Sequence, residues 1–362
     1  MPLRNPFARP DPATYKREIK QGLDRAFGAA PEQELELEGA RLIVFSDHHK
    51  GARDGADDFQ RCERAYNAAL AYYLASGHRL VALGDVEELW ECAPAEVIGS
   101  YPQTLGLEAE FHKAGRYDRF FGNHDDLWGE PRQVSKHLGR LFPQLSVREA
   151  LKLRVTSQGS TVGLLFLAHG HQGTRDSDRF SGVSRLFVRH VWRPLQRKLG
   201  MASTTPAVDW ELRGAHDTAM FEWARDHGDR PVLIAGHTHR PVFGSSKPEL
   251  ETDRKSSEIE RALLEREAAG AGQGELARLR AELEWARAEE RRVRNQTPGS
   301  VSPPCYFNTG CCSFGDGDIT GLEIADGEIR LVRWPDRDGK PTPLTLTSEP
   351  LTDVFGAVAD GG

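Results

Sequence analysis

Two histidines separated by one residue follow an apolar run in the second half of the chain. The run Val232–Ile234 has the composition of a buried strand, and after Gly236 the chain presents His237 and His239. On an extended chain, residues i and i+2 point the same way, so both imidazoles are expected to face one point just beyond the strand. Two imidazoles delivered together are suited to binding a metal ion, although an isolated H-x-H pair arises as readily from structure or chance.

The same pattern recurs at the ends of four more apolar runs. Each run is followed at once by side chains that can bind a metal. They are Asp47 and His49 after Arg41–Phe45, Asp85 after Arg79–Leu83, Asn123, His124 and Asp125 after Tyr117–Phe121, and His169 and His171 after Val162–Ala168. Helical stretches alternate with these runs, which predicts an α/β architecture, and open α/β sheets place their ligands at the carboxyl ends of the strands.

The mixture of donor types indicates which metals to expect. Carboxylate, imidazole and amide groups together suit manganese, iron or zinc better than a thiolate site would. The candidate ligands are Asp47, His49, Asp85, Asn123, His169, His237 and His239. They exceed the needs of one ion, so two divalent cations are expected, with manganese first. The single carboxylate of Asp85 could bridge two ions about 3.5–4 Å apart, which is the spacing of two-metal hydrolytic sites.

The elements that must position these groups are predicted from periodicity. Tyr15–Phe27 predicts a short amphipathic helix, and Asp57–Ser76 predicts a helix with one buried face. Glu34–Glu38 alternates as a strand does, and it is expected to pair with Arg41–Phe45 as a hairpin or as two neighbouring strands.

The two ends of the chain carry less information. Residues 1–14 are rich in proline and predict a loose arm, so residues 1–40 are expected to form an arm, a helix and a first strand. Near the other end, Asp326-Gly327 predicts the tight turn of a hairpin spanning Ile319–Val332. Residues 336–362 are expected to be an irregular tail.

Two stretches differ in composition from the rest. Arg175–Met201 interleaves arginines with apolar residues. It is either a helix that packs on the core with snorkelling arginines, or a lid that meets an anionic or amphiphilic substrate or a membrane surface, with Arg179 as a candidate for substrate contact. Pro248–Gln296 predicts a helical hairpin of about Ser257–Ala268 and Glu275–Arg294, which serves either as a solvated insertion or as a surface for a homodimer or partner.

The composition is that of a soluble globular protein with one large domain and insertions, or with two domains: 362 residues, 38% hydrophobic and 28% charged. A formal net charge of −7 argues against binding of a polyanion by the molecule as a whole, although local patches can be basic.

The sequence has no apolar run of membrane-spanning length and no apolar core of a secretory signal. Five cysteines without C-x-x-C spacing fit a reduced setting. A cytoplasmic protein is therefore expected, with peripheral contact at the inner membrane face as the alternative.

Together, the motifs D-x-H, G-D, G-N-H-D, H-G-H and G-H-T-H resemble those of the calcineurin-like metallophosphoesterase superfamily. All five occur in the family's order between about residues 41 and 310. The resemblance implies a four-layer α/β/β/α sandwich over residues 41–335, with its site at the carboxyl ends of the strands. It further implies that one metal is held by Asp47, His49 and His239 and the other by Asn123, His169 and His237, with Asp85 bridging and His124 over the scissile phosphate.

The implied reaction is hydrolysis of a phosphomonoester, a phosphodiester or a diphosphate. Two cations lower the pKa of a bridging water, so hydroxide is available near neutral pH to attack phosphorus. His124 would stabilise charge on the phosphoryl oxygens or protonate the leaving oxygen. Asp125 would orient that imidazole or have an ordinary structural role. On an extended chain His48 and His171 alternate away from the ligands, which favours supporting roles, and His171 is also a candidate for substrate contact.

Two motif contexts bear on the substrate. The sequences G-D-V-E-E-L-W and G-H-T-H-R-P resemble the branch that contains UDP-2,3-diacylglucosamine pyrophosphohydrolases, which cleave a lipid-linked diphosphate. The chain departs from that branch at G-N-H-D, where the branch usually has arginine for histidine, and at H-G-H, where it has H-G-D. The expected partner is a phosphorylated small molecule or lipid, and net acidity disfavours nucleic acid. The alternative from another class is a non-catalytic scaffold of the same fold that binds a partner through its helical hairpin.

Overall fold

The computed structural model describes residues 11–173, 210–244, 303–315, 317–336 and 339–360, with a few single positions between 245 and 302. The chain divides into two units, one made of Met1–Gly244 with Pro304–Gly362 and the other of Ser245–Pro303. Within the described residues the protein is a mixed α/β protein with two mixed β-sheets and seven α-helices.

Both sheets belong to the first unit. The six-stranded sheet has the order β1-β6-β7-β8-β10-β9 and consists of β1 (Glu32–Glu36), β6 (Ala150–Ser157), β7 (Ser160–Ala168), β8 (Val232–Ala235), β10 (Tyr306–Thr309) and β9 (Pro241–Val242). The seven-stranded sheet has the order β13-β12-β11-β2-β3-β4-β5 and consists of β13 (Leu344–Pro350), β12 (Glu328–Trp334), β11 (Ile319–Ala325), β2 (Arg41–Phe45), β3 (Arg79–Leu83), β4 (Tyr117–Phe120) and β5 (Val147–Arg148).

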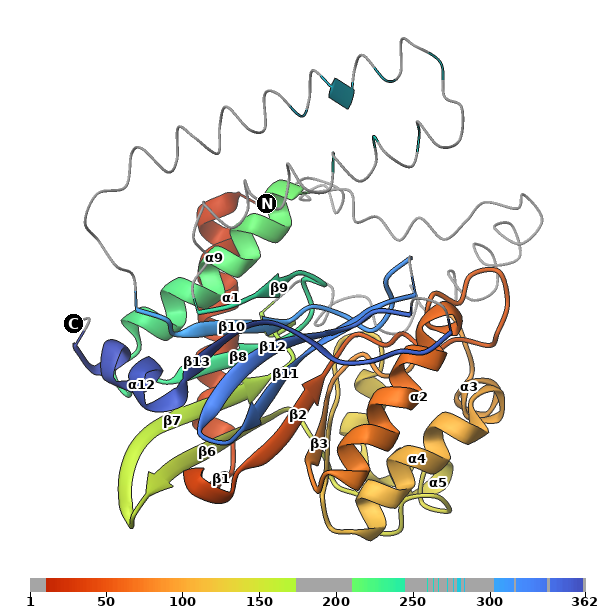
Figure 1. Ribbon diagram of the computed structural model, residues 1–362, viewed down its shortest axis with the longest axis horizontal. Coiled ribbons are helices and arrows are strands. Elements are labelled where there is room, and N and C mark those ends of the chain that lie inside the picture. Colours follow the sequence, from red (N-terminus) through yellow and green to blue (C-terminus); the bar gives the residue numbers. More distant parts are fainter. Residues whose placement is uncertain are drawn as a thin grey trace, which may run out of the picture. The chain divides into compact units, whose positions relative to one another are not determined.

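The helices cover the two sheets separately. α1 (Pro12–Ala29) and α9 (Trp210–Asp226) pack on each other and contact the six-stranded sheet, and α2 (Phe59–Ala75) and α4 (Pro102–Lys113) contact the seven-stranded sheet (Figure 1). The remaining helices are α3 (Pro94–Ser100), α5 (Pro131–His137), α12 (Leu351–Asp360) and the short 3-10 helices η1 (Leu37–Gly39) and η2 (Asp126–Gly129).

The apolar run of β2 explains this arrangement, because its alternate side chains reach two different cores. Leu42 and Val44 join a buried cluster that includes strands of the six-stranded sheet. Ile43 and Phe45 point to the other face and pack with Phe59 and further aromatic residues of α2. A strand that is buried on both faces needs apolar side chains at successive positions, so its sequence is a continuous apolar run.

The strand directions bring the predicted site together. β2, β3 and β4 run parallel to one another, and so do β7, β8 and β10. The carboxyl ends of parallel neighbours lie at the same edge of a sheet, so the residues that follow these strands meet at two facing sheet edges.

Two predictions about the N-terminal region are wrong. Glu32–Glu36 does not pair with β2, because η1 turns the chain and β1 instead lies parallel to β6, with Glu32 opposite Lys152. The loose arm also ends earlier than residue 14, since α1 begins at Pro12 and Asp11 caps it by accepting the Thr14 N–H. The part of the predicted arm before Asp11 lies outside the described residues.

The hairpin predicted from Asp326-Gly327 is confirmed. β11 and β12 are antiparallel, and Ala325 lies opposite Glu328 across a two-residue turn. Asp326 and Gly327 have φ of 55° and 81°, as a type I′ turn requires at both central positions.

The prediction of an irregular C-terminal tail is wrong. β13 adds an edge strand to the seven-stranded sheet, and α12 packs on β7. Leu351, Val354, Phe355 and Val358 recur at helical spacing and are buried, so one face of α12 joins the core. The guanidinium of Arg230 donates to the carbonyl oxygen of Ala359 at the carboxyl end of this helix.

Truncating Phe355 measures how much α12 contributes to stability. The ring is 5% exposed, and it lies so close to Gly163 that a Cβ at that glycine would overlap it. We expect Phe355→Ala to lower the free energy of unfolding by about 3 kcal/mol, because it leaves a cavity against β7. Urea denaturation measures this, with Leu346→Ala on the exposed face of β13 as the control that should change little. Equal stability of the two variants would contradict docking of α12.

Two predicted insertions lie largely outside this description. Arg175–Met201, with Arg179, falls among residues that the structure does not describe. In the second unit only single positions are described, and those that fall in the predicted hairpin arms are helical, with Leu276 and Leu283 buried. The hairpin itself stays a prediction.

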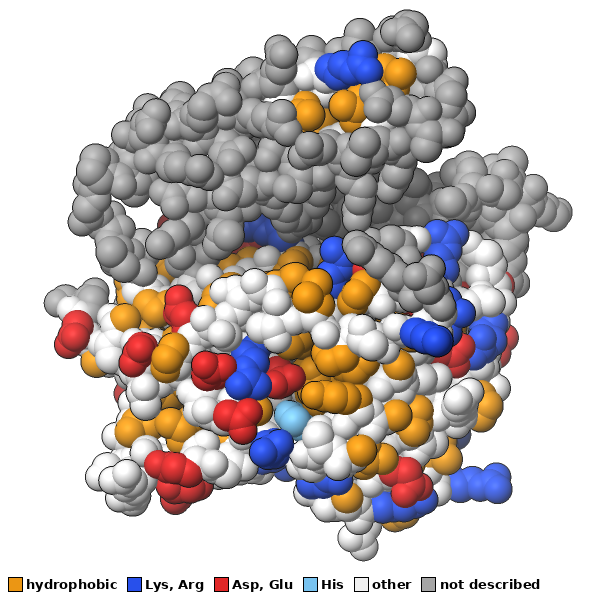
Figure 2. All heavy atoms as spheres, viewed as in Figure 1, with side chains coloured by type: hydrophobic (Ala, Val, Ile, Leu, Met, Phe, Trp, Pro, Cys, Tyr) orange, Lys and Arg blue, Asp and Glu red, His pale blue; other side chains and the backbone are white. Residues whose placement is uncertain are grey.

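The helices and the exposed apolar side chains of the described residues bear on contact with a membrane. None of the described helices is long and apolar enough to cross a membrane. Figure 2 shows apolar side chains gathered over the middle of the face in view. The exposed large apolar residues of the described chain are Tyr72 on α2 and Leu344 and Leu346 on the edge strand β13.

Candidate metal centre

The predicted strand-end side chains converge on one place. Their ligand atoms form three overlapping groups, within each of which all atoms lie within 4.8 Å of one another. The groups are Asp47, His49 and His239; His49, Asp85 and His124; and Asp85, His169 and His237. His239 Nε2 lies 3.2 Å from Asp47 Oδ1, and His169 Nε2 lies 3.1 Å from Asp85 Oδ2. The predicted convergence of distant segments is confirmed.

Both sheets contribute to the centre. Asp47 follows β2 and Asp85 follows β3 in the seven-stranded sheet, whereas His169 follows β7 and His237 follows Gly236 at the end of β8 in the six-stranded sheet. The centre therefore lies where the carboxyl ends of the two sheets face each other.

The prediction that the D-x-H and H-x-H side chains face one way because they lie on extended chain is wrong. Asp47, His49, His237 and His239 do not lie on extended chain; their φ angles are 53°, 50°, 68° and 56°, in the left-handed region. Asp85 shares this conformation, with φ of 50°. Such backbone costs about 1–3 kcal/mol per residue, and it persists where surrounding contacts enforce it.

Backbone hydrogen bonds between strand ends supply part of that enforcement. Asp47 N donates to Gly84 O at 3.1 Å, and His49 N donates to Asp85 O at 2.9 Å. The D-x-H turn after β2 is thus tied to the G-D turn after β3, and the spacing of the motif reflects this turn rather than a strand face.

The glycines of G-N and G-H leave room for ligands from other strands. A Cβ at Gly122 would overlap Asp85 Oδ1 and come within 2.7 Å of His169 Nε2. A Cβ at Gly236 would overlap Ser46 Oγ and lie 2.5 Å from Asp47 Oδ2. Close approach, rather than turn formation alone, therefore accounts for glycine at these two motif positions.

Several buried polar atoms of the predicted ligands have no hydrogen-bond partner, which tests whether a cation fits. They include Asp47 Oδ1, Asn123 Oδ1 and His169 Nε2. His169 Nδ1 donates to Leu83 O at 2.8 Å, so in the neutral ring Nε2 carries a lone pair. That lone pair faces Asp85 Oδ2, and the two acceptors repel each other unless positive charge lies between them. These atoms therefore fit a bound cation, and their types fit manganese, iron or zinc.

The charges in the centre also favour a cation. Burial by itself would raise the pKa of Asp47, but His239 and His169 hold it below its ordinary value. The pKa of Asp85 is likewise lowered against the effect of burial, chiefly by His169. Conversely, burial would lower the pKa of His169, but Asp85 and Asp47 raise it to about 9. Two buried carboxylates thus attract positive charge strongly, and metal ions can supply it in place of protons.

Glu88 and Trp90 are members of the site that the sequence did not reveal. Glu88 Oε2 lies 2.7 Å from His124 Nδ1 and 3.2 Å from His49 Nδ1, so one carboxylate holds both imidazoles by the same ring position. The indole of Trp90 stacks on His124 with ring centroids 4.1 Å apart. Burial would raise the pKa of Glu88, but these imidazoles lower it to about 2, so it is ionised. An acidic residue three positions after Asp85 was the available signal.

Asp125 has the structural role that was left open as an alternative. Its carboxylate accepts the backbone N–H groups of Gly122 at 2.6 Å, Val86 at 2.9 Å and Asp85 at 3.2 Å. It therefore ties the end of β4 to the end of β3, and Glu88 occupies the position that would orient His124.

The two neighbouring histidines are buried. His48 packs against Tyr66 with ring centroids 4.6 Å apart, as a supporting role predicts. His171 is 5% exposed, and its ring centroid lies 5.4 Å from that of His169. The side chain of His171 is thus beside the ligands but largely enclosed, and Arg179, the other residue predicted to contact substrate, lies outside the described residues.

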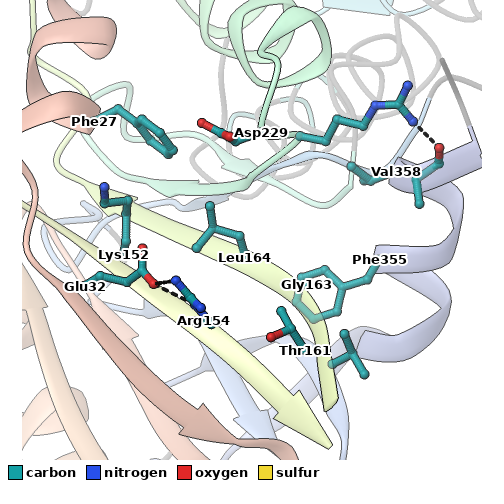
Figure 3. A pocket seen from close by; sticks show the side chains of 13 residues that line it. Phe27, Glu32, Lys152, Arg154, Thr161, Gly163, Leu164, Asp229, Phe355 and Val358 are labelled. Atoms are coloured by element: carbon teal, nitrogen blue, oxygen red, sulfur yellow. Dashed lines mark hydrogen bonds and ion pairs between the residues drawn. The ribbon is translucent and has the colours of Figure 1, made fainter.

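A separate pocket of about 410 Å³ shares no residue with the metal centre (Figure 3). Its walls come from α1, β1, β6, β7, α12 and the segment that precedes β8. Arg154 is paired with Glu32 there, and the ammonium of Lys152 lies over the ring of Phe27. The pocket is therefore not the entrance to the predicted site.

Comparisons with known proteins found no matching family model, no similar curated protein and no similar solved structure. The motifs and the geometry of the centre are therefore the observations on which a function for this chain can be proposed.

Proposed function

We propose that the chain is a binuclear metallophosphoesterase that hydrolyses a phosphomonoester, phosphodiester or diphosphate. The observation that carries the proposal is the convergence of carboxylate and imidazole atoms from five strand ends into three overlapping groups, in which Asp47 Oδ1 and His169 Nε2 are buried without a hydrogen-bond partner. Two sheets with helices packed on each support a further proposal, that the fold is the four-layer α/β/β/α sandwich of the calcineurin-like superfamily.

The distances support a division of the ligands between two metals. Asp47, His49 and His239 would hold one ion, and Asn123, His169 and His237 would hold the other. Asp85 Oδ2 lies 3.8 Å from His49 Nε2 and 3.1 Å from His169 Nε2, between the two sets, as a bridging carboxylate requires. When bound, two divalent cations, manganese first with iron or zinc as alternatives, would lower the pKa of a water and offset charge on phosphoryl oxygens.

The chain itself prepares His124 for proton transfer. Because Nδ1 of this ring donates to Glu88, Nε2 is the atom left to meet a substrate. Burial would lower the pKa of His124, but Glu88 and Asp85 raise it to about 10 in the metal-free chain. Stacking on Trp90 restricts the ring to one orientation. His124 is thereby placed to donate to a phosphoryl oxygen or to the leaving group.

Metal reconstitution tests the proposal directly. Purified protein is stripped with a chelator, loaded with Mn²⁺ and assayed with an aryl phosphomonoester, an aryl phosphodiester and a nucleotide-linked diphosphate. We expect two ions per chain and hydrolysis of at least one substrate, lost on chelation and restored by Mn²⁺. The preferred substrate separates monoesterase, diesterase and diphosphatase, including the lipid-diphosphate alternative. Failure to bind metal, or metal binding without turnover of any class, would favour the scaffold alternative.

A further inference from the structure

α9 presents two consecutive buried polar residues to the loops that carry the histidine ligands. His216 is 2% exposed and Asp217 is fully buried, although a helix normally turns one of two neighbours toward solvent. Neither residue belongs to the three ligand groups. Each instead bonds to a different histidine loop of the six-stranded sheet.

His216 holds the loop that carries His169. Its Nε2 lies 2.8 Å from Gly170 O. Since a carbonyl oxygen only accepts, Nε2 carries the ring proton, and Nδ1 accepts from the hydroxyl of Tyr15 on α1 at 2.9 Å. The His216 ring also lies 4.9 Å from that of His237, so it contacts one ligand directly and supports the loop of another.

The backbone of α1 also contacts the end of the same loop. A Cβ at Gly173 would overlap the backbone oxygen of Glu18, so the end of this loop rests on the backbone of α1. The N-terminal helix α1 is therefore linked to the metal centre through Tyr15 and this contact.

Asp217 holds the loop that carries His237 and His239. It accepts from Thr238 Oγ1 at 2.9 Å, and Thr238 lies between the two histidines. It also accepts from the Tyr306 hydroxyl at 2.7 Å and pairs with Arg240 at 2.9 Å. The amide of Asn308 completes the support by donating to the carbonyl oxygen of Gly236 at 2.7 Å.

We propose that His216 and Asp217 are positioning residues that set the six-stranded-sheet half of the metal centre. His216 supports the Asp85–His169–His237 group, and Asp217 supports the turn between His237 and His239. The inference rests on the proposed function. Ligands held in left-handed turns need rigid neighbours, and residues that orient metal ligands typically change metal affinity by 10–100-fold.

The unequal contacts of His216 give a selective test. It donates to Gly170, next to His169, and its ring contacts His237, whereas among the described residues no hydrogen bond or ring contact joins it to the Asp47–His49–His239 group. We expect His216→Phe to weaken one of two Mn²⁺ ions about 10-fold or more and to leave the other within about twofold. Tyr15→Phe, which removes only a hydroxyl, should weaken the same ion by a smaller factor. His216→Gln keeps an N–H for Gly170 O and should restore part of the affinity.

The measurement is titration of metal-free protein with Mn²⁺ by calorimetry, with thermal unfolding of each variant as a check on folding. The matched control is Trp223→Phe, which removes the 2.7 Å hydrogen bond between α9 and Asp24 on α1 two helical turns away. It should leave both Mn²⁺ affinities unchanged.

Each outcome decides the matter. Unchanged affinities in folded His216→Phe would overturn the inference, and so would equal weakening in Trp223→Phe, because the effect would then be general to the helix pair. If His216→Phe does not fold, Tyr15→Phe decides by the same criterion. If the wild-type chain binds no Mn²⁺, the proposed function and this inference both fail. If it binds two ions but the variants match it, only the inference fails.

Discussion

Replacing Asp85 with asparagine should lower kcat/KM by about 10³-fold or more, which corresponds to about 4 kcal/mol of transition-state stabilisation. Asp85 Oδ1 accepts the His124 N–H at 2.8 Å, and an amide oxygen can keep that bond. The amide nitrogen would then face His169 Nε2 and donate to its lone pair. The variant is therefore expected to fold while its amide takes the place that the cation would occupy.

Asp118→Asn is the matched control for this experiment. Asp118 is also a buried carboxylate on a strand of the seven-stranded sheet, but it pairs with Arg148 at 2.6 Å and with Arg79, outside the ligand groups. Its kcat/KM should stay within about twofold of wild type, even if stability falls. Wild-type turnover by Asp85→Asn with two Mn²⁺ bound would show that the assigned bridge is wrong.

The side chains that converge at the candidate centre could be found from sequence, although the backbone conformation expected for them was wrong. The motifs that follow five apolar runs identified the side chains that converge, and close approach at Gly122 and Gly236 explains why two of these motifs contain glycine. The left-handed backbone of Asp47 and His239 could not be predicted, since non-glycine residues rarely adopt it and nothing in their composition marks it.

Long-range pairing limited the prediction of the fold. β1 was placed beside β2 because they are adjacent in sequence, but its partner β6 lies more than a hundred residues further on. β13 was missed because all seven of its residues are exposed, which leaves no buried face to create an apolar alternation. The helical spacing of α12 was present in the sequence, with Leu351, Val354 and Phe355 on one face, and could have been recognised.

The roles of Tyr15 and His216 could not be predicted from the sequence either, because their contact is also long-range. Tyr15 and His216 bond at 2.9 Å but are separated by 201 positions, and each is a single polar residue within a helix. Short motifs report groups that share a turn, whereas these contacts exist only once α1 and α9 have packed together. Glu88 is intermediate between a motif residue and a long-range contact. It is close in sequence to Asp85, but its partners, His49 and His124, come from two other strand ends.

Glu88→Gln should lower kcat by about 10²-fold and shift the alkaline limb of the pH profile to lower pH. The carboxylate is the largest influence that raises the pKa of His124, so its neutralisation lowers that pKa. A general acid works in its protonated form, which is present below its pKa and is lost as pH rises through it. Lowering the pKa therefore ends activity at a lower pH. Steady-state kinetics from about pH 5 to pH 10 measure the shift.

The neighbouring residue supplies the control, because it points away from the centre. Glu87 is buried against Arg119 and accepts from Trp128 Nε1 at 2.9 Å. Glu87→Gln leaves Arg119 in a weaker pairing, so it should cost stability, by up to about 3 kcal/mol, without moving the alkaline limb. If both variants shift the profile equally, the effect is one of general charge rather than of the Glu88–His124 contact. If Glu88→Gln leaves kcat and the profile unchanged, His124 is not the proton donor.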